Sequence, residues 1–248
     1  MKLDKFKQRQ IDYYCQKWQN YQKSPKEKTP VAKYFSNFAL NKVVKIFPIE
    51  FKDKNILISC GGGDGFEIIK MENFGGKITV SDISPDAIKE IKKKWPKMKT
   101  VIADAEKLPF KDNSFQIGLV KDGLHHLVKP EEGIKELLRV CSEAVIIIDF
   151  KESFLTRFVS GIGLSPEFEE AGNYNFRFST KKLQKFLSKV KVKDYRIKSC
   201  FVHAPLFQHS FLQKGIGFYL MKLSSETLNL LFGNLGNVLL VVIIKNVK

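Results

Sequence analysis

The sequence has few cysteines, no long apolar run and no apolar stretch at its start, and each of these absences argues against a class of protein or site. The four cysteines are far apart and include no CxxC pair, which argues against a structural zinc site: Cys15, Cys60, Cys141 and Cys200. The longest apolar run, at 238–244, is far too short to span a bilayer as a helix, so it predicts a buried strand. The start, MKLDKFKQRQ, contains no apolar stretch that would indicate a secretory signal. We expect a reduced, cytoplasmic protein without a metal.

Acidic residues are also few, and their distribution along the chain is uneven. The sequence has 26 Asp and Glu against 42 Lys and Arg, a formal net charge of +16. Residues 1–54 hold 13 basic against 5 acidic residues, residues 55–150 hold 14 against 15, and residues 151–248 hold 15 against 6. Basic flanks of this kind suit an anionic substrate, an anionic membrane or a nucleic acid, or are simply a solvated lysine-rich surface. Nucleic acid is the least favoured partner, because arginines are few and no RNA-binding module or Asn-Pro-Pro-Tyr-type motif is present.

The middle of the chain alternates between strand-like and helix-like patterns. We expect strands over 55–60, 77–82, 99–104, 115–122 and 144–150, with helices over 66–74, 86–95 and 130–141. Ser84 and Pro85 form a good cap and first turn for the second of these helices. Alternating units with apolar strands predict an α/β fold with a parallel sheet that is covered on both faces.

The two flanks are less regular. Residues 12–22 and 31–47 read as helices joined by an exposed linker, and residues 179–190 and 193–202 read as a helix and a strand. Residues 205–235 are mostly apolar and helical in character, before a last strand over 237–245. The stretch 151–178 is long and irregular, which is typical of a segment that closes a site.

The stretch LISCGGGDG follows the first expected strand and contains four glycines within five positions: Gly61, Gly62, Gly63 and Gly65. Glycine at such a turn permits tight bending or lets a ligand approach the backbone, and a merely tight turn remains an alternative. Asp82 ends the second strand, where a carboxylate can accept both hydroxyls of a ribose. Asp104 and Ala105 end the third strand, where a carboxylate and a backbone N–H can bind an adenine. The three strand ends together outline an adenosine.

A nicotinamide dinucleotide fits this loop poorly. The fingerprint GxGxxG would require glycine at Phe66 when it is read from Gly61, and at Asp64 and Glu67 when it is read from Gly62. The sequence also has no Tyr-x-x-x-Lys pair after the fourth strand.

The motifs LISCGGGDG, VSDIS, IADAEKLPFKDNSFQIGLVKDGLHHL and ELLRV resemble class I S-adenosylmethionine-dependent methyltransferases, in the branch that contains quinone-biosynthesis and other small-molecule methyltransferases. The resemblance covers residues 50–150 well. It implies a Rossmann-like sheet of seven strands in the order 3-2-1-4-5-7-6, mostly parallel, with helices on both faces and a helical substrate cap. Residues 1–50 would form an N-terminal helical lid. Residues 51–248 would form the methyltransferase domain, with substrate-side insertions at 151–178 and 205–235.

The resemblance also implies which residues hold S-adenosylmethionine and its product S-adenosylhomocysteine. These are Ser59, Cys60, Gly61, Gly62, Gly63, Gly65, Asp82, Ile83, Asp104, Ala105 and Lys121. The family usually has an acid at the position of Ser59, so Asp64 is a candidate for that charge.

A proton acceptor could come from KDGLHHL, as Asp122, His125 or His126, because histidine titrates near neutral pH. His-His is also common at this position of the family where its role is packing or helix capping. Asp149 and Glu152 are weaker candidates. The aromatic residues of the first helix would form a lid or simply pack that helix onto the core: Tyr13, Tyr14, Trp18 and Tyr21.

We therefore expect methyl transfer to a small-molecule or lipid-like acceptor. Alternatives are an RNA or protein methyltransferase, and a methyltransferase-like binding protein without catalysis. The apolar segment 205–235 beside a basic flank could admit a lipid-like acceptor or touch an anionic membrane, or it could be a helical pair packed on the sheet edge.

Overall fold

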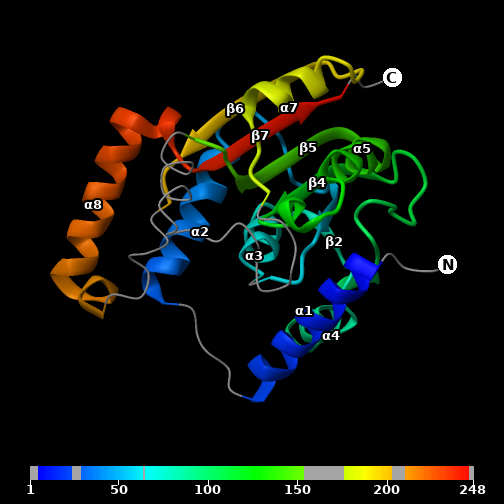
Figure 1. Ribbon diagram of the computed structural model, residues 1–248, viewed down its shortest axis with the longest axis horizontal. Coiled ribbons are helices and arrows are strands. Elements are labelled where there is room, and N and C mark those ends of the chain that lie inside the picture. The colour runs from blue at the N-terminus through cyan, green and yellow to red at the C-terminus, as the bar shows by residue number, and fades with distance from the viewer. Residues whose placement is uncertain (1–4, 24–28, 64, 154–175, 203–209, 246–248) are drawn as a thin grey trace.

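The computed structural model describes residues 5–23, 29–63, 65–153, 176–202 and 210–245 (Figure 1). Seven strands form one sheet in the order β3-β2-β1-β4-β5-β7-β6, which confirms the expected order. The strands are β1 Asn55–Ser59, β2 Lys77–Asp82, β3 Lys99–Ile102, β4 Phe115–Lys121, β5 Cys141–Phe150, β6 Asp194–Cys200 and β7 Val238–Ile244.

Only β7 runs against the other strands, which agrees with the expected mostly parallel sheet. It pairs antiparallel with β5 on one side and with β6 on the other, whereas the pairs from β3 to β5 are parallel. The strand order reverses at β1, because β2 and β3 lie on one side of it and β4 and β5 lie on the other. Ligands of open α/β sheets bind beyond the carboxyl ends of the strands at such a reversal. The topology therefore places a candidate site after Ser59.

Helices cover both faces of the sheet, because successive strand side chains point to opposite faces. Ile56 and Ile58 of β1 face a core formed with α2, α3 and α4, whereas Leu57 faces a core formed with α5 and α7. The helices are α1 Lys5–Lys23, α2 Pro30–Val43, α3 Phe66–Asn73, α4 Pro85–Lys94, α5 Pro130–Val140, α7 Thr180–Leu187 and α8 Gly215–Phe232. Short 3₁₀ turns are η1 Leu124–His126, η3 Ser210–Gln213 and η4 Gly233–Leu235. In Figure 1, α1 lies beside α4 and α8 lies at the outer edge beyond α2.

The start of α4 follows from its sequence. The Ser84 hydroxyl accepts a hydrogen bond from the N–H of Ala87 at 3.2 Å, and Pro85 occupies the first helical position. A capping hydroxyl satisfies one of the amides that the first turn leaves unpaired. This confirms the expected cap and fixes the backbone just after Asp82.

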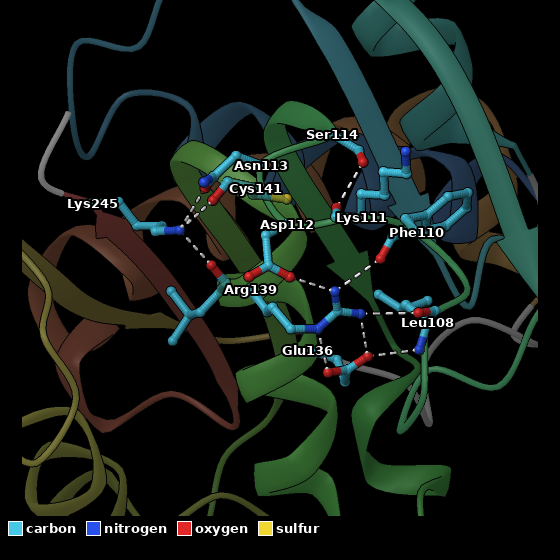
Figure 2. A network of polar contacts seen from close by, with 11 residues as sticks. Leu108, Phe110, Lys111, Asp112, Asn113, Ser114, Glu136, Arg139, Cys141 and Lys245 are labelled. Atoms are coloured by element: carbon cyan, nitrogen blue, oxygen red, sulfur yellow. Dashed lines mark hydrogen bonds and ion pairs between the residues drawn. The ribbon is translucent and has the colours of Figure 1, made fainter. Parts of the chain in front are cut away.

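Several boundaries differ from the sequence-based expectation. The first helix, expected over 12–22, begins at Lys5, and the third strand, expected to end at 104, ends at Ile102. The helix expected over 31–47 ends at Val43. The fifth strand begins at Cys141, directly after α5, rather than at 144. The ammonium of Lys245 explains the early start of the fifth strand, because it donates to the carbonyl oxygens of Leu138 and Cys141 at 2.6 Å each and so satisfies the end of the helix without a separate turn (Figure 2).

Arg139 of α5 fastens the loop that leads from the third strand to the fourth. Figure 2 shows its guanidinium donating to the carbonyl oxygens of Leu108 and Phe110 and to the carboxylates of Asp112 and Glu136, all at 2.8–2.9 Å. Glu136 in turn accepts from the N–H of Leu108 at 2.8 Å. The hydrogen bonds from Arg139 lower the pKa of the Glu136 carboxyl. The motifs LPF and ELLRV are therefore joined by this network, and their role in the structure is architectural.

No helix in the described part of the chain is long and apolar enough to cross a membrane. Most of the expected insertion 151–178 lies outside the described residues. At its ends, Lys151 and Phe178 form an isolated bridge beside β5.

Candidate functional site

The glycine-rich loop after β1 owes most of its glycines to close packing. A Cβ at Gly61 would lie 2.5 Å from Val80, and a Cβ at Gly65 would lie 2.3 Å from the ring of Trp95. Gly65 also has a φ of +77°, where other residues are strained. A Cβ at Gly62 would lie 2.7 Å from a carboxylate oxygen of Asp82. These three positions exclude side chains because the protein itself fills the space.

Gly63 differs from its neighbours, because it faces open space. The nearest atom to a Cβ at this position would be a carboxylate oxygen of Glu67 at 3.9 Å. Gly63 lines a cavity of about 970 Å³ that lies beyond the carboxyl ends of β1, β2 and β4. The closest approach of a ligand to the backbone is therefore expected at Gly63. Asp64 lies outside the described residues.

Asp82 stands at the end of β2 and joins two loops at the cavity wall. One carboxylate oxygen accepts the N–H of Gly62 and the other accepts the N–H of Ser84, both at 2.9 Å. Burial raises the pKa of the Asp82 carboxyl, and the two backbone N–H groups oppose part of that rise. A carboxylate accepts about four hydrogen bonds, so both oxygens keep capacity for a ligand's hydroxyl groups.

Asp104 lies beyond β3 and is already engaged by a cation from α1. One of its carboxylate oxygens lies 2.5 Å from Nζ of Lys7, and the other accepts the N–H of Glu106 at 2.9 Å. Nζ of Lys7 also lies 2.7 Å from the Glu106 carboxylate. Burial acts to lower the pKa of Lys7, but the hydrogen bonds to the two carboxylates outweigh it and raise that pKa. Lys7 was not foreseen from the sequence, since one lysine in a basic flank carries no distinguishing pattern.

Lys121 and Asp122, at the end of β4, form an ion pair in the cavity wall. Nζ of Lys121 lies 2.5 Å from the Asp122 carboxylate. Burial acts to lower the pKa of Lys121, but the charges of Asp122 and Glu67 reverse this and raise it. The backbone of Asp122 has a φ of +50°, so the chain turns sharply here. Asp122 is thus already paired with a cation.

His125 is buried and held by a second buried group. Its Nδ1 lies 2.7 Å from a carboxylate oxygen of Asp149, which is itself fully buried at the end of β5. Asp149 also accepts the N–H groups of Leu124, His125 and Phe150. His125 does not line the cavity. The hydrogen bonds to Asp149 hold η1 against β5 and so orient the next residue of η1, His126.

His126 lies in the cavity wall, where α1 reaches it. The hydroxyl oxygen of Tyr14 lies 3.1 Å from Nδ1 and 3.0 Å from Nε2 of His126. The side-chain amide of Gln10 donates to the carbonyl oxygen of His126. The rings of His125 and His126 are 3.8 Å apart between centroids. A titratable imidazole is therefore held at the cavity by groups on two sides.

The structure brings most of the residues predicted from sequence to this cavity. Those in its wall are Cys60, Gly62, Gly63, Asp82, Ile83, Asp104, Ala105, Lys121, Asp122 and His126. Ser59, Gly61, Gly65 and His125 lie behind the wall. Of the aromatic residues expected to form a lid, Tyr14 lines the cavity. The ring of Tyr13 packs edge-on against the ring of Tyr14, with 5.3 Å between the centroids. The side chains of Trp18 and Tyr21 are not among those that the structure describes.

Among the described residues, no group of three or more His, Cys, Asp or Glu side chains could hold a metal ion.

A model of a known family covers the part of the chain that builds the cavity. Residues 58–148, from β1 to β5, match the methyltransferase domain family. The matched region carries the motifs that resemble class I S-adenosylmethionine-dependent methyltransferases, and the sheet has the strand order that this resemblance implies. The expected resemblance is thereby confirmed.

Within that class, the sequence is similar to quinone-biosynthesis enzymes. It is 30% identical over 98 residues to a demethylmenaquinone methyltransferase of Paenarthrobacter aurescens. The match covers 40% of this chain and 38% of that relative. The chain thus spans less than half the length of the relative.

Solved structures show the same fold over nearly the whole chain. A methyltransferase of Thermotoga maritima, described as a possible histamine N-methyltransferase, is 18% identical and has a TM-score of 0.61 over 96% of this chain and 99% of its own. Phosphoethanolamine N-methyltransferase 2 of Haemonchus contortus, in complex with S-adenosyl-L-methionine, has a TM-score of 0.55 at 15% identity. It covers 84% of this chain and 52% of its own.

Proposed function

We propose that this protein transfers a methyl group from S-adenosylmethionine to a small-molecule or lipid-like acceptor of the quinone type. The observation that carries the proposal is the conjunction of Asp82 and Gly63 at the reversal point of the sheet. There, two oriented carboxylate oxygens lie beside a stretch of open backbone. The similarity to a demethylmenaquinone methyltransferase supports the choice of acceptor class.

The residues present fit the methyl donor. The open position at Gly63 is a cradle that a Cβ would fill, and Asp82 offers acceptors for two ribose hydroxyls. Asp104 and Ala105 would bind the adenine, with Ile83 beside its ring. The cavity of about 970 Å³ lies at the upper end of the usual range for ligand pockets, which leaves room for an acceptor as well.

The bound donor supplies a methyl group on a sulfonium, which needs a nucleophile in line with it. The chain's own contribution is mostly alignment and exclusion of water, and alignment is potentially worth several powers of ten in rate. Part of the cavity wall is apolar, with Phe35 and Ala39 from α2 and Phe150 from the end of β5. An aromatic or aliphatic acceptor would be held there by burial of its apolar surface.

A ring nitrogen of His126 would take the acceptor's proton. Among the predicted acid–base residues, His126 combines cavity exposure with hydrogen bonds that position it, since His125 is buried against Asp149 and Asp122 is paired with Lys121. The Tyr14 hydroxyl would hold the imidazole and receive its hydrogen bond.

Residues 1–50 would act as a cap over the cavity. Lys7, Gln10 and Tyr14 of α1 and Phe35 of α2 all reach its wall. In the described part of 205–235, α8 packs on α2 through Met221 and so supports this cap from outside. The insertion at 151–178 stays a prediction, since most of it lies outside the described residues.

Titration calorimetry with S-adenosylmethionine, S-adenosylhomocysteine and NADH tests the donor. We expect binding of the first two and none of NADH; the opposite result would end the proposal. Asp82→Asn should weaken donor binding by about ten- to hundredfold, because an amide cannot accept at both atoms. Asp53→Asn, at an exposed loop position, is the matched control and should bind normally.

Incubation with labelled S-adenosylmethionine and a fractionated cell extract tests the acceptor. Label in the organic-soluble or small-metabolite fraction supports the proposal. Label in RNA or protein would show that the acceptor is a macromolecule and not a small molecule or lipid. Tight donor binding with no label in any fraction would favour a binding protein without catalysis.

A further inference from the structure

The helix α8 presents an apolar face to the outside of the molecule. Every fourth residue on its inner side is buried, namely Gly217, Met221, Ser225 and Asn229. The opposite side carries six large apolar side chains whose exposed fractions run from 50% at Leu223 to 84% at Leu230. The six, which we call the α8 face, are Ile216, Tyr219, Leu220, Leu223, Leu230 and Leu231. Figure 1 places α8 at the edge of the molecule, beyond α2.

This distribution inverts the usual amphipathic pattern, in which apolar side chains of a surface helix face the core. Instead, the inner side is fixed by polar contacts. The Asn229 amide accepts the N–H of Phe201 at 2.9 Å and donates to the carbonyl oxygens of Phe201 and Ser225 at 3.1 and 2.9 Å. These bonds set the rotation of the helix about its axis. The α8 face is therefore held outward by the fold.

A row of this length is more than the scattered exposure that soluble proteins tolerate. Single exposed apolar residues are ordinary, whereas a contiguous patch marks an interaction surface. An 18-residue helix is about 27 Å long, and the six side chains form two groups on it, four over residues 216–223 and two at 230–231. Exposed Ser224, Glu226 and Thr227 lie between the two groups. Phe211 of η3 and Leu235 of η4, next to its two ends, are also more than 60% exposed.

Positive charge borders the α8 face. Lys42 and Lys198 line a hollow of about 230 Å³ together with Leu230 and Leu231. Lys222 is exposed on α8 itself. From residue 201 to the end of the sequence, Glu226 is the only acidic residue, and its carboxylate accepts a hydrogen bond from the hydroxyl of Tyr34 at 3.4 Å. Apolar side chains beside basic ones are the combination that binds an anionic lipid surface.

The inner side of α8 leads towards the cavity. Met221 packs against Val31 and Phe35 of α2, with Val202 beside them. Phe35 and Val202 also line the cavity. One small apolar cluster therefore separates the α8 face from the proposed acceptor site, so an acceptor dissolved in a bilayer would have a short route to that site.

We propose that α8 docks the protein onto an anionic lipid bilayer, with the α8 face in the interface and Lys42 and Lys198 among the headgroups. The helix would lie in the plane of the membrane and would not cross it. The proposal rests on the proposed function only for its biological purpose, because bilayer binding needs neither methyl donor nor acceptor. Its test therefore fails or succeeds independently of methyl transfer.

Flotation with vesicles made of equal parts phosphatidylcholine and phosphatidylglycerol measures the docking, with no donor present. We expect the protein to float with these vesicles, to float less with pure phosphatidylcholine, and to lose part of its binding as salt is raised. Leu223→Gln with Leu230→Gln should weaken binding by about tenfold or more. Lys42→Gln with Lys198→Gln should weaken it by about tenfold on the anionic vesicles alone.

Two matched control variants separate the α8 face from general changes in surface polarity or charge. Ile69→Gln with Ile102→Gln removes two exposed apolar side chains from α3 and β3. Lys181→Gln with Lys182→Gln removes two exposed charges from α7, on the other face of the sheet. Both controls should float like the unaltered protein. Circular dichroism and thermal unfolding should show all four variants folded, since every altered leucine or isoleucine is exposed.

Two results would overturn the proposal. One is equal flotation of the Leu223→Gln, Leu230→Gln variant and the unaltered protein. The other is absence of flotation together with a stable dimer in sedimentation that the same two substitutions convert to a monomer. In that case a second copy of the chain covers the α8 face.

Discussion

Removal of the Lys7 ammonium should loosen α1 from the body of the protein. Lys7 is the point at which the proposed cap is tied to the third strand end, because its Nζ bridges the carboxylates of Asp104 and Glu106. Lys7→Met keeps a long apolar stem and helix propensity and removes only the charge. The substitution therefore tests the ion pair rather than the helix.

The size of the effect follows from the contacts. Each of the two charge-assisted hydrogen bonds contributes about 1.5 kcal/mol, the low end of the usual range, since Lys7 keeps some contact with water. Ordering a lysine side chain costs about 2 kcal/mol in return. The balance is about 1 kcal/mol, which corresponds to an increase of about fivefold in the fraction of molecules with α1 released.

Amide hydrogen exchange measures that release directly. Amides of α1 should exchange about fivefold faster in Lys7→Met, while amides of α5, which lies on the other face of the sheet, should keep their rates. Donor affinity should fall by a similar factor, because release of α1 removes Gln10 and Tyr14 from the wall of the cavity.

Lys5→Met is the matched control, since it removes the same charge from an exposed position of the same helix. It should leave the exchange of α1 unchanged. Unchanged exchange of α1 in Lys7→Met would refute the tie between Lys7 and the third strand end. Faster exchange of α1 and α5 together would show a general loss of stability instead.

Three further predictions concern the loop, the Arg139 network and the imidazole. Gly63→Ala should leave the thermal midpoint nearly unchanged and weaken donor binding in calorimetry. Gly62→Ala should lower the free energy of unfolding by about 1–3 kcal/mol, because its Cβ would meet the carboxylate of Asp82. Equal stability of the two variants would contradict this prediction. Glu136→Gln should destabilise the protein at neutral pH but make its stability fall less on acidification. The reason is that the folded-state pKa of Glu136 is lowered, so its contribution is present above the usual carboxyl range and disappears as the pH drops through the lowered value; parallel profiles of urea-unfolding free energy against pH would refute it. Tyr14→Phe should reduce turnover and shift its pH profile while donor binding stays nearly normal, and an unshifted profile would remove Tyr14 from the positioning of His126.

The core of the fold was predictable because its signals are local and repeated. Buried strands appear as short apolar runs, and Ser84 with Pro85 marks a helix start that the structure reproduces. The strand order came from the family resemblance, since no periodicity encodes which strand lies beside which. The start of β5 was wrong by three residues, because the group that closes α5 is Lys245, more than a hundred residues away in the sequence.

The site was predictable where residues follow strands and unpredictable where they come from the flanks. Asp82 and Asp104 are found from their positions alone. Lys7 and Gln10 are not, because their role depends on how α1 folds back over the sheet. The sequence alone also did not decide whether the apolar residues of α8 are packed or exposed, because an apolar helix is compatible with both.

The packing of the glycine loop limits what a glycine motif can diagnose. Gly61, Gly62 and Gly65 are needed by neighbouring side chains or by the backbone itself, and only Gly63 meets open space. A descendant of this protein that had stopped binding the donor would still be selected to keep three of the four glycines, simply in order to fold. An intact motif in a genome survey is thus a marker of ancestry, and a loss of activity during evolution would first become visible at position 63.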